Sequence, residues 1–183
     1  MQTIVFTMGT LPLPQITLRY EGPFDFDGMY AAIIDWAKNY GYLWLEKSYK
    51  HKVPSPKGAE LEFEWEMTKN VTEYINYRIT FTVHAWDTTE VEVTVDGKKK
   101  TLTNSRIYII IDGKVETDWQ KRFSGSKFAQ KLGGWYEKLM GKNIEGIYWD
   151  QLYYRIWNLH AILKKYFDLQ SKKYQYKGYL KEN

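Results

Sequence analysis

The residue types best suited to chemistry lie in the stretch AELEFEWEM, residues 59–67, where every second position is a glutamate. Carboxylates bind metal ions or exchange protons, and both tasks need several oxygen atoms at one point. Side chains that alternate along one strand do not converge in this way. We therefore interpret the row as the solvated face of a half-buried antiparallel strand, with a metal or acid–base role as the alternative. The expected outer face carries Glu60, Glu62, Glu64 and Glu66, and the inner face Leu61, Phe63, Trp65 and Met67.

Other ionisable groups fall near this row or on the last helix. His84 stands on the expected outer face of its own strand and is interpreted as an exposed side chain. His160 lies at the edge of a helical apolar stripe, either as a core histidine or as a polar group in a cavity. The cations expected to pair with the glutamate row are Lys47, Lys50 and Arg78.

The sequence lacks the motifs of several enzyme classes. It has no cysteine, which excludes disulfides, thiolate metal sites and a cysteine nucleophile. It also has no Gly-x-Ser-x-Gly elbow, no phosphate-binding loop and no HExxH motif. We therefore predict no cofactor, no metal and no catalytic residue, and a non-enzymatic role is favoured.

The composition fits one globular domain. The chain has 183 residues, of which 44% are hydrophobic, enough for a substantial core. A net charge of +4 permits an anionic partner without requiring one. Frequent lysine, glutamate and aromatic residues without cysteine are typical of heat-adapted proteins. No run approaches the roughly 20 apolar residues of a membrane span, so a cytoplasmic protein is expected.

Hydrophobic periodicity predicts the order strand, helix, six strands, short helix, long helix. Asp25 or Asp27 is expected to cap the first helix, and Gly41 to end it. Tight turns are expected at Asp96-Gly97 and Asp112-Gly113, and a break of the short helix at Gly133-Gly134. The predicted strands are 15–22, 42–52, 59–67, 74–86, 89–95, 106–112 and 114–123, and the helices are 25–40, 126–140 and 144–170.

These elements predict an α+β domain over residues 15–170, with a curved antiparallel sheet of about seven strands gripping a long C-terminal helix. The element order resembles the START-like (helix-grip, SRPBCC) superfamily. In that superfamily a long terminal helix closes a cavity over the sheet. The helix over 126–140 departs from the family pattern and would cap one end of such a cavity.

Large aromatic residues stand on the expected inner face of the sheet. They either fill the space beneath the long helix or line a cavity for an apolar or aromatic ligand. The candidate ligand-binding residues are Trp65, Tyr77, Trp119 and His160.

Both ends of the chain are unusual. Residues 1–14 are apolar and are expected to form an extra edge strand or an arm that docks on another subunit. Residues 171–183 form a basic, tyrosine-rich tail, and such a mixture suits either nucleic acid or plain solubility. The candidate nucleic-acid-binding residues are Lys164, Lys165, Lys172, Lys173, Tyr174, Tyr176 and Lys177.

Three functional hypotheses follow from these patterns. The first is a non-catalytic binding module of START-like shape that holds an apolar ligand or a protein partner. The second is an interaction or assembly protein, associated with nucleic acid or a nucleoprotein particle, that uses the two ends of the chain. The third is a cyclase- or hydrolase-like enzyme using Tyr77, His160 or a glutamate.

Overall fold

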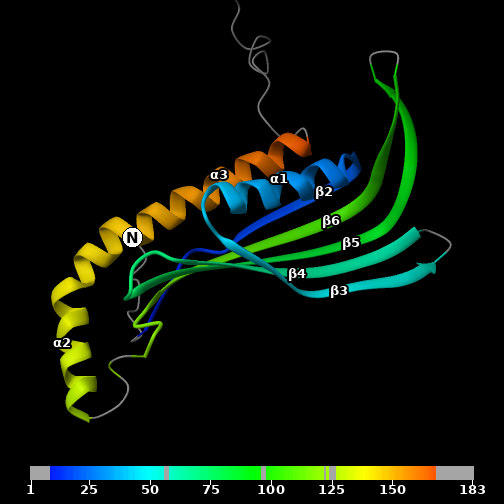
Figure 1. Ribbon diagram of the computed structural model, residues 1–183. Helices are drawn as coiled ribbons and strands as arrows, with labels where there is room; N and C mark the ends of the chain where they lie inside the picture. Colours follow the sequence, from blue (N-terminus) through cyan, green and yellow to red (C-terminus); the bar gives the residue numbers. More distant parts are fainter. Residues whose placement is uncertain (1–8, 56–57, 96–97, 122, 124–126, 168–183) are drawn as a thin grey trace, which may run out of the picture.

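The protein is built on one open antiparallel sheet, shown in the computed structural model in Figure 1. The structure describes residues 9–55, 58–95, 98–121, 123 and 127–167. The predicted α+β class, with an antiparallel sheet and a C-terminal helix, is confirmed. The sheet has six strands, which are β1 (Thr10–Pro12), β2 (Ile16–Phe24), β3 (Leu43–Ser55), β4 (Gly58–Asn70), β5 (Ile75–Val95) and β6 (Lys98–Thr117).

The last strand, β6, lies inside the sheet. On one side it is followed by β5, β4 and β3 in that order. On its other side β2 pairs with the middle of β6, with Ile16 opposite Ile111, and β1 pairs with its end, with Leu11 opposite Val115. Strands β5 and β6 are 21 and 20 residues long, and their outer part extends beyond the helices (Figure 1).

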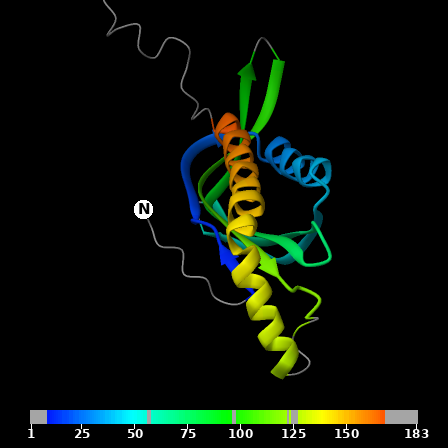
Figure 2. The ribbon, with the colours of Figure 1, turned by 90° about the vertical axis from the view of Figure 1, so that its left-hand side faces the viewer.

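Two helices cover one face of the sheet. Helix α1 (Phe26–Asn39) begins where Asp25 Oδ1 accepts a hydrogen bond from the Gly28 amide at 2.9 Å. The turn after α1 has Gly41 at φ +72°, so the predicted cap and stop are both confirmed. Helix α3 (Asp150–Tyr166) contacts α1 and β6 (Figures 1 and 2).

The core lies between this helical layer and alternate residues of the strands. Phe63, Trp65 and Met67 are buried, as the alternation in 59–67 predicted. The face of α3 that meets the sheet carries apolar residues at three- and four-residue steps, which is the helical period. These residues are Leu152, Ile156, Leu159 and Leu163, and all four are buried.

One predicted turn and one predicted strand boundary differ from the structure, and the turn predicted at Asp96-Gly97 lies outside the described residues. Strand β6 runs straight through Asp112-Gly113, so no hairpin forms there, and Gly113 pairs with Ile79 of β5. Segments 74–86 and 89–95 belong to one strand, β5, with a bulge at Asp87, where φ is +56°. A bulge bends the strand while β5 and β6 stay paired. In the sequence pattern, the same interruption was interpreted as the end of a strand.

The short helix is not broken at its glycines. Helix α2 (Lys127–Asn143) continues through Gly133 and Gly134, and a π-helical segment, η1 (Ile144–Trp149), joins it to α3. A Cβ at position 133 would lie 2.9 Å from Phe123 Cβ. Gly133 therefore allows close packing of the preceding loop and does not interrupt the helix.

The glycine in β6 also serves close packing. A Cβ at position 113 would overlap Cδ1 of Ile156 in α3. We expect Gly113→Ala to lower the free energy of unfolding by about 1–3 kcal/mol, because overpacking forces side chains from their preferred rotamers. Urea denaturation measures this cost. Ile156→Val removes the atom in conflict, so the double variant should lose less stability than the two single losses added; full additivity would contradict the steric explanation.

Candidate binding site

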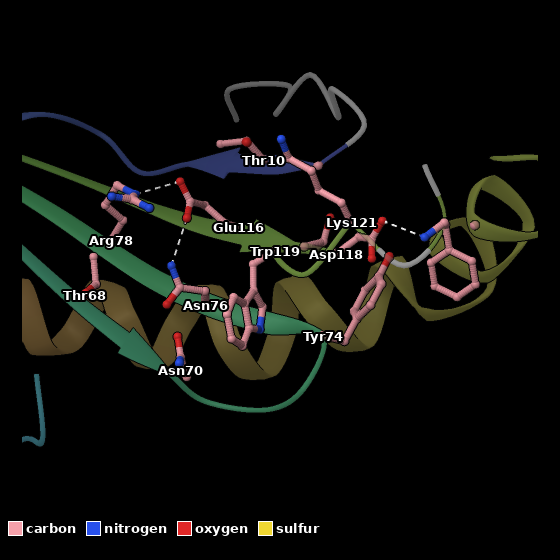
Figure 3. A pocket seen from close by; sticks show the side chains of 14 residues that line it. Thr10, Thr68, Asn70, Tyr74, Asn76, Arg78, Glu116, Asp118, Trp119 and Lys121 are labelled. Atoms are coloured by element: carbon pink, nitrogen blue, oxygen red, sulfur yellow. Dashed lines mark hydrogen bonds and ion pairs between the residues drawn. The ribbon is translucent and has the colours of Figure 1, made fainter. Parts of the chain in front are cut away.

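A pocket of about 820 Å³ lies on the face of the sheet opposite α3, near the ends of β4, β5 and β6. Its floor consists of outward-facing residues of these strands, and its far wall is the chain that leaves β6 (Figure 3). Ligand pockets commonly have volumes of about 300–1,000 Å³. Its lining includes Tyr74, Asn76, Arg78, Glu116 and Trp119.

A charged network fixes the floor of the pocket. Arg78 donates from Nε to Glu116 Oε1 at 2.8 Å, and its Nη1 lies 2.7 Å from Glu66 Oε1. Glu116 also accepts a hydrogen bond from Asn76 Nδ2 at 2.8 Å and pairs with Lys114 at 3.0 Å. Burial raises the pKa of Glu116, but the hydrogen bonds from Arg78, Asn76 and Lys114 outweigh it and bring the pKa to about 2. The network keeps Glu116 ionised, and the positive charges of Arg78 and Lys114 balance its negative charge.

One atom on this floor lacks a partner. Asn76 is only 4% exposed, and its Nδ2 is committed to Glu116, which fixes the orientation of the amide. Asn76 Oδ1 is buried and accepts no hydrogen bond from the described residues. A buried acceptor without a donor costs about 1–3 kcal/mol. Because the Asn76 side chain lines the pocket, a small shift of this side chain would present the acceptor to a ligand N–H or O–H group.

Aromatic rings form the wall of the pocket. Trp119 donates from its indole Nε1 to the Thr72 carbonyl at 3.1 Å, and Tyr74 packs edge-to-face on Phe123 at 6.2 Å between ring centroids. Trp119 was expected on the inner face of a strand. Strand β6 instead ends at Thr117, and Asp118, with φ at +49°, redirects the chain so that Trp119 lines this outer pocket.

The other three predicted ligand residues lie elsewhere. Trp65 is fully buried in the core and donates to Glu46 Oε2 at 3.2 Å. Tyr77 is also in the core, where its hydroxyl bonds to Gln151 Oε1 at 2.9 Å and burial raises its pKa. His160 is half-buried on α3, and burial and then Lys164 lower its pKa. The structure therefore does not bring the four residues to one site.

The glutamate row forms the predicted surface ion pairs. Glu66 pairs with Arg78 at 2.7 Å and with Lys47 at 3.5 Å, and Glu62 pairs with Lys50 at 3.5 Å. Each exposed pair of this kind contributes about 0–1 kcal/mol.

His84 was predicted to be an exposed side chain, but it is half-buried and joins this row. The pairing of β4 with β5 sets Glu62 opposite His84, and His84 Nε2 lies 2.5 Å from Glu60 Oε1. Hydrogen bonds from His84 and then Lys52 lower the pKa of Glu60. The register between β4 and β5 places this histidine beside the carboxylates, and the local sequence pattern does not report that register.

Glu60, Glu62 and His84 could also hold a metal ion, since their donor atoms lie within 4.8 Å of one another. However, the Lys52 ammonium already lies 3.2 Å from Glu60 and 2.9 Å from Glu62. A divalent ion would have to displace this lysine, so the geometry favours an ion-pair cluster.

The predicted nucleic-acid-binding residues lie only partly within the described structure. Lys164 and Lys165 lie in the last turn of α3, while Lys172, Lys173, Tyr174, Tyr176 and Lys177 lie outside the described residues.

At the N-terminal end of the described chain, Leu11 of β1 is buried, and the Pro12 carbonyl accepts a hydrogen bond from Trp149 Nε1 at 3.0 Å. The apolar segment therefore packs on the sheet and on the C-terminal helical layer from Thr10 onward, and residues 1–8 lie outside the described part.

Together, the fold and the site define an open antiparallel sheet that carries a C-terminal helix on one face and a pocket on the other. A scan against protein-family models and a search of curated protein sequences both found no match to this chain. In the described part of the chain, no helix combines the length and apolar character needed to cross a bilayer.

Proposed function

We propose that this protein is a non-catalytic binding module that holds a small aromatic ligand in the pocket on the outer face of the sheet. The observation that carries the proposal is Asn76 Oδ1, a buried acceptor for which the described residues supply no donor, in a side chain that lines the pocket. A ligand hydroxyl or N–H group placed there satisfies this atom. The ligand ring then packs against Trp119 and Tyr74, which line the same pocket.

The charges of the pocket favour a neutral ligand. Arg78 is engaged by two carboxylates, Glu116 and Glu66, so its charge is already compensated. A charged ligand would have to break this network or accept an unpaired charge at a partly buried site, which is costly.

The same charges support a binding role over a catalytic one. A general base works best when its pKa lies near the operating pH. Glu116 has a pKa of about 2 and is hydrogen-bonded on both oxygens. It is therefore a weak proton acceptor at neutral pH, and its arrangement suits the fixing of Asn76.

The START-like shape remains part of the proposal, with one difference. In the helix-grip pattern the ligand lies between the sheet and the long helix. In this protein that space holds fully buried side chains, among them Trp65, Tyr77 and Phe81. We therefore place the ligand on the opposite face, and the absence of cysteine favours a cytoplasmic setting.

Two matched probes test the proposal. 2-Naphthol offers an aromatic ring with a hydroxyl donor, and 2-methoxynaphthalene has the same ring without the donor. We expect 2-naphthol to bind about tenfold more tightly by calorimetric titration, since a buried hydrogen bond contributes about this factor. Asn76→Ala should abolish the difference between the two probes.

Ring packing is tested by a matched pair of tryptophan variants. Trp119→Ala should weaken the binding of both probes, while Trp86→Ala, on the same outer face but outside this pocket, should leave binding unchanged. Equal affinity of the unaltered protein for the two probes, or binding that ignores Trp119→Ala, would refute the proposal.

A further inference from the structure

Large apolar side chains project from one face of α2 into solvent. Phe128, Leu132, Trp135 and Leu139 are 77%, 46%, 62% and 62% exposed. Their spacing of four, three and four residues places them in one row along the helix, which we name the apolar stripe. Exposed apolar rows of this size mark interaction surfaces, because contact between apolar side chains and water costs free energy.

The stripe is not part of the protein core. Helix α2 extends past the sheet, and Figures 1 and 2 both show it projecting from the body of the protein. The side of α2 that meets the rest of the chain is a different one: Gly133 is buried, and Ala129 and Met140 are half-buried. At about 100° per residue these three residues lie roughly 120° round the helix from the stripe.

Lysines flank the stripe. The sequence of α2 contains four lysines and one glutamate. Lys127, Lys131 and Lys138 are exposed. At about 100° per residue they lie roughly 90° to one side of the stripe, where their long side chains reach past its edge.

This charge pattern disfavours an antiparallel pair of α2 helices from two copies of the chain. If two α2 helices packed stripe to stripe in antiparallel fashion, the same flanks would face each other. The lysine row of one copy would then meet the lysine row of the other, and like charges that face each other across an interface are costly.

We propose that the occupant is an anionic lipid surface, on which α2 lies in the plane of the membrane. Tryptophan, phenylalanine and leucine on one face with lysines beside them form the pattern of interfacial helices. Trp135 and its neighbours enter the boundary between headgroups and acyl chains, and the lysines bind lipid phosphates. The proposal is independent of the aromatic ligand, since it rests on the stripe and not on Asn76.

Vesicle co-sedimentation of the full chain tests this inference, with phosphatidylcholine vesicles that contain or lack phosphatidylserine. We expect the affinity for the phosphatidylserine vesicles to be at least about tenfold higher. Trp135→Ser combined with Leu139→Ser should lower that affinity by about tenfold or more. Lys131→Gln combined with Lys138→Gln should remove most of the preference for phosphatidylserine.

The control is Leu43→Ser, which removes an apolar side chain that is 71% exposed on β3, away from the stripe. It should leave vesicle binding unchanged. All variants keep the basic residues 171–183, so a loss of binding reports α2 and not the tail. Lipid binding that survives the double serine variant would overturn the inference, as would a dimer in solution that only this variant dissociates, with no lipid binding in the unaltered protein.

Discussion

Trp65→Ala is expected to lower the free energy of unfolding by about 3–5 kcal/mol, the usual cost of truncating a large buried ring. Trp65 is fully buried, with Phe63 and Phe81 4.6 and 5.5 Å from it between ring centroids and Tyr30 edge-on at 4.6 Å. Removing it leaves a cavity bounded by rings that cannot collapse freely. Chemical denaturation followed by far-UV circular dichroism measures the loss.

The matched control is the adjacent residue on the other face of β4. Glu64→Ala changes a side chain of the outer face, so its cost should stay within about 0.5 kcal/mol. The comparison tests the face of the strand, because the two positions are adjacent in β4 and point to opposite sides of the sheet. Similar costs at both positions would show that the assignment of inner and outer faces is wrong.

Replacing Glu116 with glutamine should remove a pH-dependent part of the stability. The pKa of this carboxyl is about 2 in the folded protein, against 4.5 for an unperturbed glutamate. Because the folded pKa is the lower one, the stabilisation is present above about pH 4.5 and is lost as the pH falls toward 2. The depression amounts to at most about 3 kcal/mol, since each pKa unit corresponds to about 1.4 kcal/mol.

We expect Glu116→Gln to be less stable than the unaltered protein by about 2–3 kcal/mol at pH 7, and the difference to shrink as the pH falls below about 4.5. Urea unfolding at a series of pH values measures this. Glu92→Gln is the control, because Glu92 is 72% exposed and 3.5 Å from an exposed lysine, Lys99. That variant should follow the unaltered protein at every pH. A pH-independent difference for Glu116→Gln would contradict the proposed ionisation.

Alternation along the strands allowed most of the fold to be predicted from the sequence. A residue period of two has one physical cause, a sheet with one dry face and one wet face. The segment 59–67 and the segment 74–86 both follow it, and each buries alternate residues, such as Phe63 and Ile79, although the predicted inner residue Leu61 is only half-buried. The cap at Asp25 was predictable for a similar reason, since its hydrogen bond to Gly28 is local in sequence.

Features that depend on contacts distant in sequence could not be predicted in this way. Gly113 resembled a turn residue, but α3, more than forty positions later, requires its small size through Ile156. The pairing of His84 with Glu60 depends on strand register. The pocket depends on Asp118, whose left-handed backbone redirects Trp119, and no periodicity reports a single dihedral angle.

The central place of β6 also bears on how the protein folds. Strand β2 is made early, yet its partner in the sheet is β6, with Ile16 opposite Ile111 and Phe24 opposite Thr103. Such pairing closes a long loop before it gains any contact, and chains dominated by distant strand pairs fold on the scale of milliseconds to seconds. During synthesis, β2 lacks its partner in the sheet until β6 has left the ribosome. A newly made chain can therefore cover the apolar residues of β2 only after β6 has been completed.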